Sequence, residues 1–193
     1  MRLDELADIV VGQIMTRVIT APGEAGTVQR QLAPKAIAKG VVIDSNISEV
    51  VVAKKVVGEK VTKEGDVIMK LSTPYEAAYI TKKHEGLVIP SFCAAIRSKG
   101  SVDPGFLCAV INSEYFTEQI KFKTAGTVLP MVKISDLRSI EIPVVSDEKM
   151  KAIGTEYMIS CQKLVLLDQM IKNEQKIMNN RVLKGLLEDE DEG

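Results

Sequence analysis

The chain has 193 residues, 46% of them hydrophobic and 26% charged, with a formal net charge of −1 at pH 7. The length suits one compact domain with an appended element, and this composition excludes a chain that is disordered throughout. The near-zero charge excludes a uniformly basic protein, so any affinity for nucleic acid has to come from the distribution of the charges.

The sequence shows no pattern typical of a secretory signal or a membrane-spanning segment. Residues 1–5 carry charges too early for a secretory signal, and no stretch approaches the roughly 18 uninterrupted apolar residues of a membrane span. We therefore expect a cytoplasmic protein that does not bind a membrane.

Cys93, Cys108 and Cys161 are widely separated, and His84 is the only histidine. We expect buried thiols, no metal site and no cofactor.

The two parts of the chain differ in charge. Residues 1–146 carry 18 Lys and Arg against 16 Asp and Glu, whereas residues 147–193 carry 7 against 10. The second part closes in an acidic tail, residues 188–193. The first part is weakly basic, which permits nucleic-acid binding without establishing it.

Strand patterns dominate the first half. Residues 3–10 have apolar positions at helical or short-strand spacing, and Gly12 ends this pattern. Four short apolar or β-branched runs follow, separated by turn residues: 41–43, 50–53, 67–71 and 87–89. We expect a sheet that starts at residue 40 and continues to about residue 98.

Helical patterns follow the strands. Asp103-Pro104 is typical of a helix start, and a second helical segment is expected through Ile120. An irregular loop at 124–130, the segment 134–137 and an alternating strand at 140–143 come next. Because strands and helices are mixed, the predicted class is α+β, a mixed β-sheet with flanking helices over residues 1–146.

A long helix is predicted for residues 147–187, after the cap Ser146-Asp147-Glu148. Apolar residues recur there at heptad spacing, and we predict that the following form a dimerisation face: Ile153, Tyr157, Leu164, Leu167, Ile171, Met178 and Val182. Such a helix is about 60 Å long, more than a domain of this size can cover, so a partner helix is expected. The alternative is a helix that folds back on its own sheet.

Several segments, in this order, resemble one protein family. The individually weaker ones are residues 3–9 with Gly12, 65–69, 88–91, 95–97 and 103–107. The more specific succession is Leu107 to Ser113, 124–127, Pro130, 134–137, 140–143 and the long helix. In these features the chain resembles the specificity subunit of type I restriction–modification enzymes. Family members commonly carry a more polar segment where this chain has residues 126–131.

The resemblance implies a function. Specificity subunits recognise double-stranded DNA, while methyltransferase and restriction subunits supply the chemistry, so this chain is expected to be non-catalytic. A full-length subunit usually holds two recognition domains and two helices, so the chain resembles half a subunit. Two copies that pair their helices would form a homodimer and recognise a split, inverted-repeat target. The expected partners are DNA, a methyltransferase subunit and, in a complex that restricts, a restriction subunit.

Recognition of DNA needs Lys and Arg for phosphates and a few polar side chains for base edges. Loop positions are favoured because their side chains are free to reach a ligand. The DNA-binding candidates are Thr16, Arg17, Gln29, Arg30, Lys82, Lys83, Lys121, Lys123, Thr127 and Lys133. For each Lys or Arg, the alternative is an ordinary solvated surface residue.

The enzyme classes considered lack their signatures. A DNA methyltransferase needs a glycine-rich cofactor loop and an Asn/Asp-Pro-Pro-aromatic motif, to which residues 72–75 bear only a superficial likeness. Residues 147–149 are explained as a helix cap rather than as a nuclease site. Nucleophilic catalysis would have to use His84, and no supporting pattern surrounds the candidate nucleophiles Cys93, Cys108 and Ser91. The stronger alternative is a coiled-coil adaptor that binds protein, with the acidic tail as a docking segment.

Overall fold

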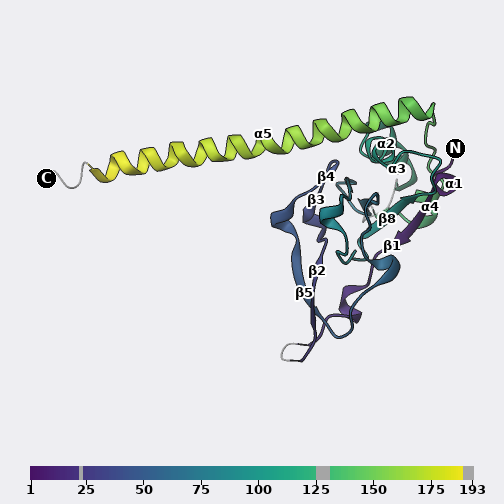
Figure 1. The fold of residues 1–193 in the computed structure, drawn as a ribbon, viewed down its shortest axis with the longest axis horizontal. Coiled ribbons are helices and arrows are strands. Elements are labelled where there is room, and N and C mark those ends of the chain that lie inside the picture. Colours follow the sequence, from purple (N-terminus) through teal and green to yellow (C-terminus); the bar gives the residue numbers. More distant parts are fainter. Residues whose placement is uncertain (22–23, 125–130, 189–193) are drawn as a thin grey trace. The chain divides into compact units, whose positions relative to one another are not determined.

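The structure, a computed structural model, describes residues 1–21, 24–124 and 131–188. The chain divides into two units, Met1–Met158 and Ile159–Gly193. The first unit contains every strand of the described residues, and the described part of the second is helix (Figure 1). The first turns of the C-terminal helix therefore belong to the compact unit.

A four-stranded sheet with the order β1-β8-β6-β7 forms the centre of the first unit. Its strands are β1 (Ala7–Val11), β6 (Val67–Lys70), β7 (Ala77–Tyr79) and β8 (Cys93–Ser98). They pair antiparallel, and Ile96 lies opposite both Ile9 and Val67. Isolated parallel bridges, such as the one between Gln13 and Pro90, accompany them. The predicted α+β class with a mixed sheet is confirmed.

The central strands are buried on both faces. Along β8, Ala94 and Ile96 belong to one hydrophobic cluster, whereas Cys93 and Ala95 belong to a second. Side chains alternate between the faces of a strand, so a strand that is covered on both sides needs a continuous apolar run. The first cluster joins the sheet to the helices, and the second joins it to residues 32–47. The sheet thus separates a helical layer from a layer of ribbons and turns.

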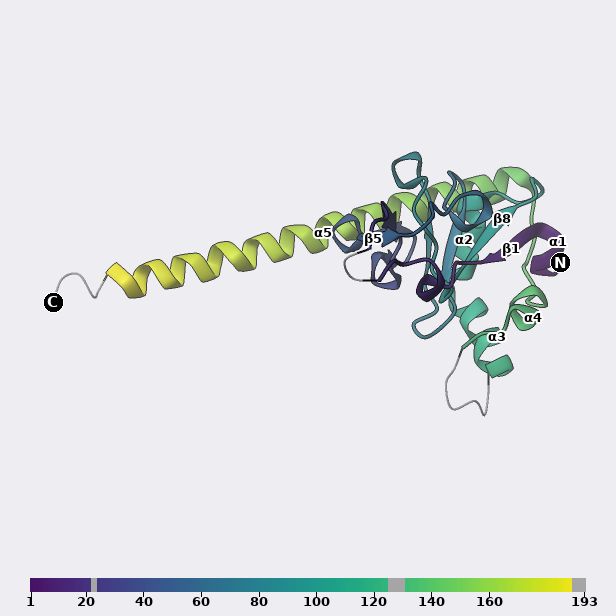
Figure 2. The ribbon, with the colours of Figure 1, turned by 90° about the horizontal axis from the view of Figure 1, so that it is seen from below.

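Among the described residues of the first unit, four short helices accompany the sheet: α1 (Leu3–Leu6), α2 (Pro104–Ile111), α3 (Glu114–Thr124) and α4 (Ile134–Arg138). Helix α2 begins as predicted, because Asp103 Oδ1 accepts a hydrogen bond from the Phe106 amide at 2.8 Å. It packs on β6 and β7, and α3 contacts α4 (Figure 2). The helices therefore cover one face of the sheet.

Two small ribbons complete the first unit. They pair β2 (Thr27–Gln31) with β5 (Ser48–Val52), and β3 (Ile37–Ala38) with β4 (Val41–Val42). The expected strands at 87–89 and 140–143 are corrected, since residues there form only isolated bridges. In the second case the backbone bonds instead to the N-terminus, where the Leu3 amide donates to the Ile140 carbonyl oxygen at 2.8 Å.

Helix α5 (Asp147–Glu188) starts where the sequence placed it and continues through both units. Met150 is 2% exposed, and Ile153 and Tyr157 pack, partly buried, against the first hydrophobic cluster. Ile153 and Tyr157 were expected in a dimerisation face. Their apolar surface is used within their own domain, so both are removed from that face.

A close approach of two backbones fixes the start of α5. A Cβ atom at Gly154 would lie 2.5 Å from the Phe106 nitrogen and 2.9 Å from the Gly105 carbonyl carbon. Only glycine therefore permits α5 to lie this close to the start of α2. Asp103, which caps α2, also lies beside Gly154. One contact thus positions both helices.

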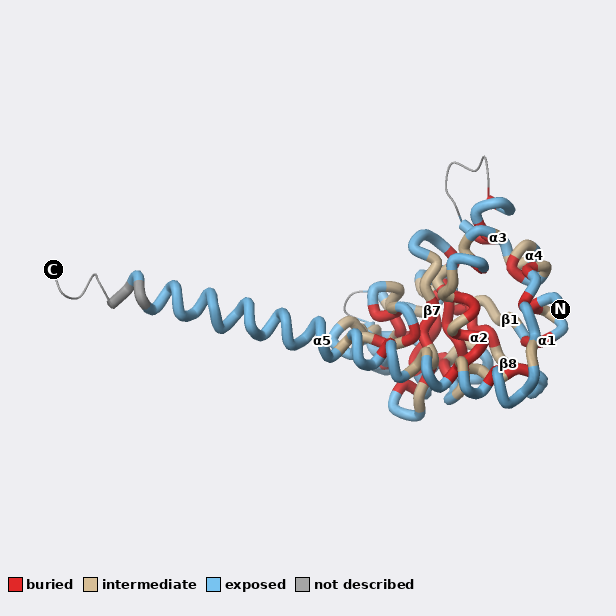
Figure 3. The backbone as a smooth tube through the Cα atoms, turned by 90° about the horizontal axis from the view of Figure 1, so that it is seen from above, coloured by how far each residue is buried: buried red, intermediate tan, exposed pale blue. Residues whose placement is uncertain are grey.

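The described part of the second unit is a solvated helix. Residues 166–184 are all exposed, as the pale blue tube of Figure 3 shows. None of the described helices combines the length and the apolar character needed to cross a membrane. Many apolar side chains of this unit nevertheless face solvent: Ile159, Leu164, Leu166, Leu167, Met170, Ile171, Ile177, Met178, Val182, Leu183 and Leu186.

We predict that Gly154→Ala destabilises the first unit by about 1–3 kcal/mol, because the added methyl group overpacks a backbone contact. The free energy of unfolding is measured by urea titration. Thr155→Ala changes the neighbouring exposed position and should leave stability within about 0.5 kcal/mol. Equal stability of the two variants would show that the helices do not meet at Gly154.

Candidate nucleic-acid interface

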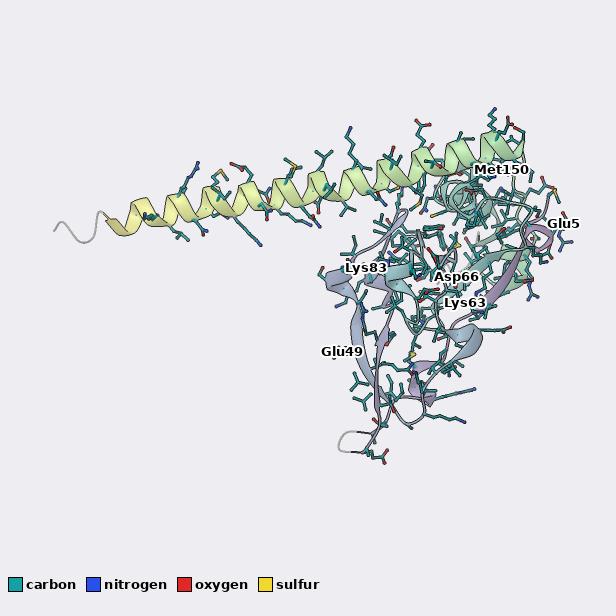
Figure 4. The ribbon with its side chains drawn as sticks, viewed as in Figure 1. Glu5, Glu49, Lys63, Asp66, Lys83 and Met150 are labelled. Atoms are coloured by element: carbon teal, nitrogen blue, oxygen red, sulfur yellow. The ribbon has the colours of Figure 1, made fainter. Side chains whose placement is uncertain are left out.

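The β2–β5 ribbon extends away from the four-stranded sheet (Figure 1). Its register places Val28 opposite Val51 and Arg30 opposite Glu49. In an antiparallel pair, directly opposite residues point to the same face. These four side chains therefore share one face of the ribbon, and Figure 4 marks Glu49 on it, away from Asp66 at the sheet.

Other residues of the same chain cover the second face of the ribbon. The Gln29 side-chain amide donates to the Val56 carbonyl oxygen at 3.0 Å and accepts from the Val56 amide at 2.7 Å. Gln29 is 8% exposed, and Val52 on the same face is completely buried. Gln29 was predicted to contact DNA, but both polar ends of its amide are used within the protein. We therefore remove it from the candidate interface.

A third segment runs beside β5. The Thr20 amide donates to the Val51 carbonyl oxygen at 3.0 Å, and the Ala53 amide donates to the Val18 carbonyl oxygen at 2.9 Å. A Cβ atom at Gly26 would lie 2.7 Å from Val51 Cγ1, so glycine is needed for this packing. The ribbon is thus held by backbone hydrogen bonds along β5.

The open face carries exposed apolar side chains, and cationic side chains lie at the ends of the ribbon. Val28 is 60% exposed and Val51 is 41% exposed. The hydrogen bond between Ala53 and Val18 brings Lys54 and Lys55 close to Arg17 at one end of the ribbon, while Arg30 lies at the other end. The cations at the ribbon are Arg17, Arg30, Lys54 and Lys55. All four are exposed, and none forms an ion pair with another described residue. Thr16, also exposed, precedes Arg17.

Lys54 and Lys55 were missed from the sequence. They follow the valine run of β5, where the pattern indicated a strand end rather than a binding loop. Their proximity to Arg17 depends on a pairing between segments that are more than thirty residues apart. The two consecutive lysines were the feature of the sequence that could have identified this part of the surface.

Lys82 and Lys83 lie in a short 3-10 turn, Lys82–His84. Lys83 Nζ is 2.6 Å from Asp44 Oδ2, and His84 Nε2 is 3.0 Å from Asp44 Oδ1. The hydrogen bond from Lys83 and then that from His84 lower the pKa of Asp44. Lys83 is thus partly neutralised, whereas Lys82 is exposed. His84 is buried, and its ring nitrogens contact Thr81 Oγ1 and Asp44 Oδ1, so it ties two turns together.

The remaining candidates lie around the end of α3. Lys121 and Lys123 are exposed, and Lys121 Nζ bonds to Glu118 Oε1 at 2.7 Å, which raises the pKa of Lys121. Lys133, just before α4, is also exposed. Thr127 lies outside the described residues. The candidates thus fall on three separate parts of the domain. The ribbon joins cations to an open apolar face, and the end of α3 carries Phe122, 86% exposed, between Lys121 and Lys123.

A charged hollow of about 710 Å³ lies beside β1. Its side chains carry both signs, including Asp8, Glu59, Lys63 and Arg138. Arg97 at its wall is held by Asp66 at 2.9 Å. This balance of charge does not suit a polyanion. The described residues also contain no group of His, Cys, Asp and Glu that could hold a metal ion.

No protein-family model matches the chain, and no curated protein matches it in sequence. Solved structures do. A chain from a structure of type I restriction–modification complex assembly is 19% identical, with a TM-score of 0.66, over 92% of this chain and 46% of that one. The HsdS subunit from Thermoanaerobacter tengcongensis is 20% identical, with a TM-score of 0.65, over 91% of this chain and 45% of that one.

The likeness shows the fold. The resemblance to type I specificity subunits, first stated from sequence motifs, is confirmed at this level. This chain spans slightly less than half the length of either matched protein.

We predict that Gln29→Met destabilises the first unit by about 1–3 kcal/mol, because the Val56 amide and carbonyl lose their buried partner. Thermal or urea unfolding measures the change. Gln31→Met, on the same strand but half-exposed, serves as the matched control and should be nearly neutral. If Gln29→Met left stability unchanged and weakened only DNA binding, Gln29 would belong to the interface after all.

Proposed function

We propose that this chain is the DNA-recognition subunit of a type I-like restriction–modification complex and is not itself a catalyst. The observation that carries the proposal is the fold match, which covers 92% of the chain. The open ribbon face with its unpaired cations supplies a surface suited to a polyanion. In this role the chain works in the cytoplasm and chooses the site, and partner subunits act on it.

We propose further that two copies pair through α5. Leu164, Leu167, Ile171, Met178 and Val182 are each 44–64% exposed, and helical geometry places them on one stripe. Twofold symmetry then gives a bipartite, inverted-repeat target whose spacer depends on the helix length.

A second apolar stripe supports a further partner. Ile159, Leu166, Met170 and Ile177 are 43–66% exposed, and at about 3.6 residues per turn they form a separate stripe roughly 110° around α5 from the first. A two-stranded coiled coil buries only one stripe, so the second is left for another helix. We assign it to a methyltransferase subunit. A restriction subunit joins in a complex that restricts.

A coiled-coil adaptor that binds protein is the second candidate function. Its support is the net charge of −1 and the acidic residues 188–193, of which 189–193 lie outside the described part of the chain. An adaptor needs the dimerising helix but no basic face. Binding to DNA therefore separates the two functions.

We expect the purified chain to be a dimer by light scattering and to bind random-sequence duplex DNA. Binding should weaken by at least about 100-fold between 50 and 200 mM salt, because several phosphate contacts release counterions. Free methyltransferase subunit is added in a parallel titration. A dimer that does not bind DNA in either titration would overturn the recognition function and favour the adaptor.

Mutations in the two stripes should have different effects, one on dimerisation and the other on binding of the methyltransferase subunit. Leu164→Glu with Ile171→Glu places charges in the dimer seam and should raise the dimer dissociation constant by at least about 100-fold. Met170→Glu with Ile177→Glu should leave the dimer intact and abolish binding of the methyltransferase subunit. Gln169→Glu, which lies outside both stripes, is the control for added charge. Sedimentation equilibrium and pull-down are the readouts. Loss of dimer by both pairs would contradict two separate faces.

A further inference from the structure

The outward face of the β2–β5 ribbon carries an unusual pair of side chains. Val28 and Val51 lie directly opposite one another and are 60% and 41% exposed. A single exposed valine is ordinary, but a cross-strand pair on a projecting ribbon forms one contiguous apolar contact surface. Thr20, which is hydrogen-bonded to Val51, adds another β-branched side chain beside them. This centre contains little that can donate or accept a hydrogen bond.

The ribbon holds this face ready for contact. Gln29 bonds twice to Val56 on the closed side, and Gly26 packs against Val51. The Gln29 contact leaves the open side free, and the Gly26 contact fixes Val51 Cγ1 on the open side itself. The side chains of Val28 and Val51 therefore keep their orientation without a ligand, which reduces the entropy lost on binding.

The dimensions and charges of the ribbon fit the DNA major groove. At Val28 and Val51 three backbone segments about 4.8 Å apart lie side by side, because Thr20 flanks Val51, and their combined backbone width of roughly 10 Å is comparable with a groove about 12 Å wide. Arg17, Lys54 and Lys55 lie at one end and Arg30 at the other, without ion pairs in the described part of the chain. Glu49 is the acid on this face. Cations at both ends of an apolar centre match a groove that is bordered by phosphates.

The chemistry of the centre selects one feature of the bases. In the major groove, guanine, cytosine and adenine present hydrogen-bonding groups, and thymine adds an apolar 5-methyl group. From this, and resting on the proposed DNA-recognition function, we propose that the Val28–Val51 face lies in the major groove and recognises a thymine methyl group. Each half of the target therefore contains a T·A pair at the ribbon, and the flanking cations hold the phosphates.

The test first identifies the bound sequence. The full-length chain is mixed with a pool of duplexes with a randomised centre, and bound duplexes are enriched at moderate salt and sequenced. We expect a motif with at least one fixed T·A pair. Each fixed thymine is then replaced by deoxyuridine, which removes only the methyl group. One replacement should weaken binding by about fourfold, the value of one buried methyl group.

A protein variant links that thymine to the ribbon. With Val51→Ala, binding of the thymine duplex and the deoxyuridine duplex should become equal, because the side chain that contacts the methyl group is gone. Val144→Ala, an equally conservative change at an exposed valine elsewhere in the domain, should keep the fourfold preference. The DNA replacement needs no protein variant, so a folding defect in Val51→Ala cannot imitate its result.

The outcomes separate the two proposals. Sequence-specific binding that no deoxyuridine replacement weakens would overturn the thymine contact and leave the DNA-recognition function standing. A preference for thymine that persists in Val51→Ala and in Val28→Ala would move the contact away from the ribbon and also overturn it. If these variants kept DNA binding but lost a protein subunit, the face would be a protein-docking surface. No enrichment of any duplex, with salt-insensitive binding, would overturn both proposals.

Discussion

The burial of β6 and β8 on both faces is the constraint on which the rest of the first unit depends. Val67, Met69 and Ile96 belong to one hydrophobic cluster, and Ile68 and Ala95 belong to the other. One layer of helices and one layer of turns and ribbons must each cover a face of the sheet, because neither face can be left in water. The helical layer holds the start of α5, and the other layer supports the projecting ribbon.

This division gives the two layers different tasks. The Gly105–Gly154 contact, the Asp103 cap and Met150 fasten α5 to the helical layer. On the other side, Gln29 closes the inner face of the β2–β5 ribbon and leaves its outer face open. The proposed surface for assembly and the proposed surface for DNA can therefore vary independently, because the buried sheet lies between the layers that support them.

Apolar side chains that remain exposed to water indicate where the chain binds its partners. A solvated helix of this length cannot gain stability from propensity alone, and most helical stability in proteins comes from packing an apolar face. The exposed leucines, isoleucines and methionines of Ile159–Leu186 are such a face without a cover in the single chain. The Val28–Val51 pair is a smaller surface of the same kind, and its flanking cations indicate a charged ligand rather than an apolar one.

Local and periodic signals were sufficient for part of this structure. The cap at Asp103, the start of α5 and the apolar runs of β6 and β8 follow from short-range hydrogen bonds and side-chain alternation, so the sequence by itself determined the α+β class and the long helix. Only the tertiary structure decided which side chains are used internally. Gln29 turns inward to Val56, Ile153 and Tyr157 pack on their own core, and Lys54 comes close to Arg17 through the pairing of Ala53 with Val18. Each of these outcomes depends on a contact between distant segments, which no local pattern specifies.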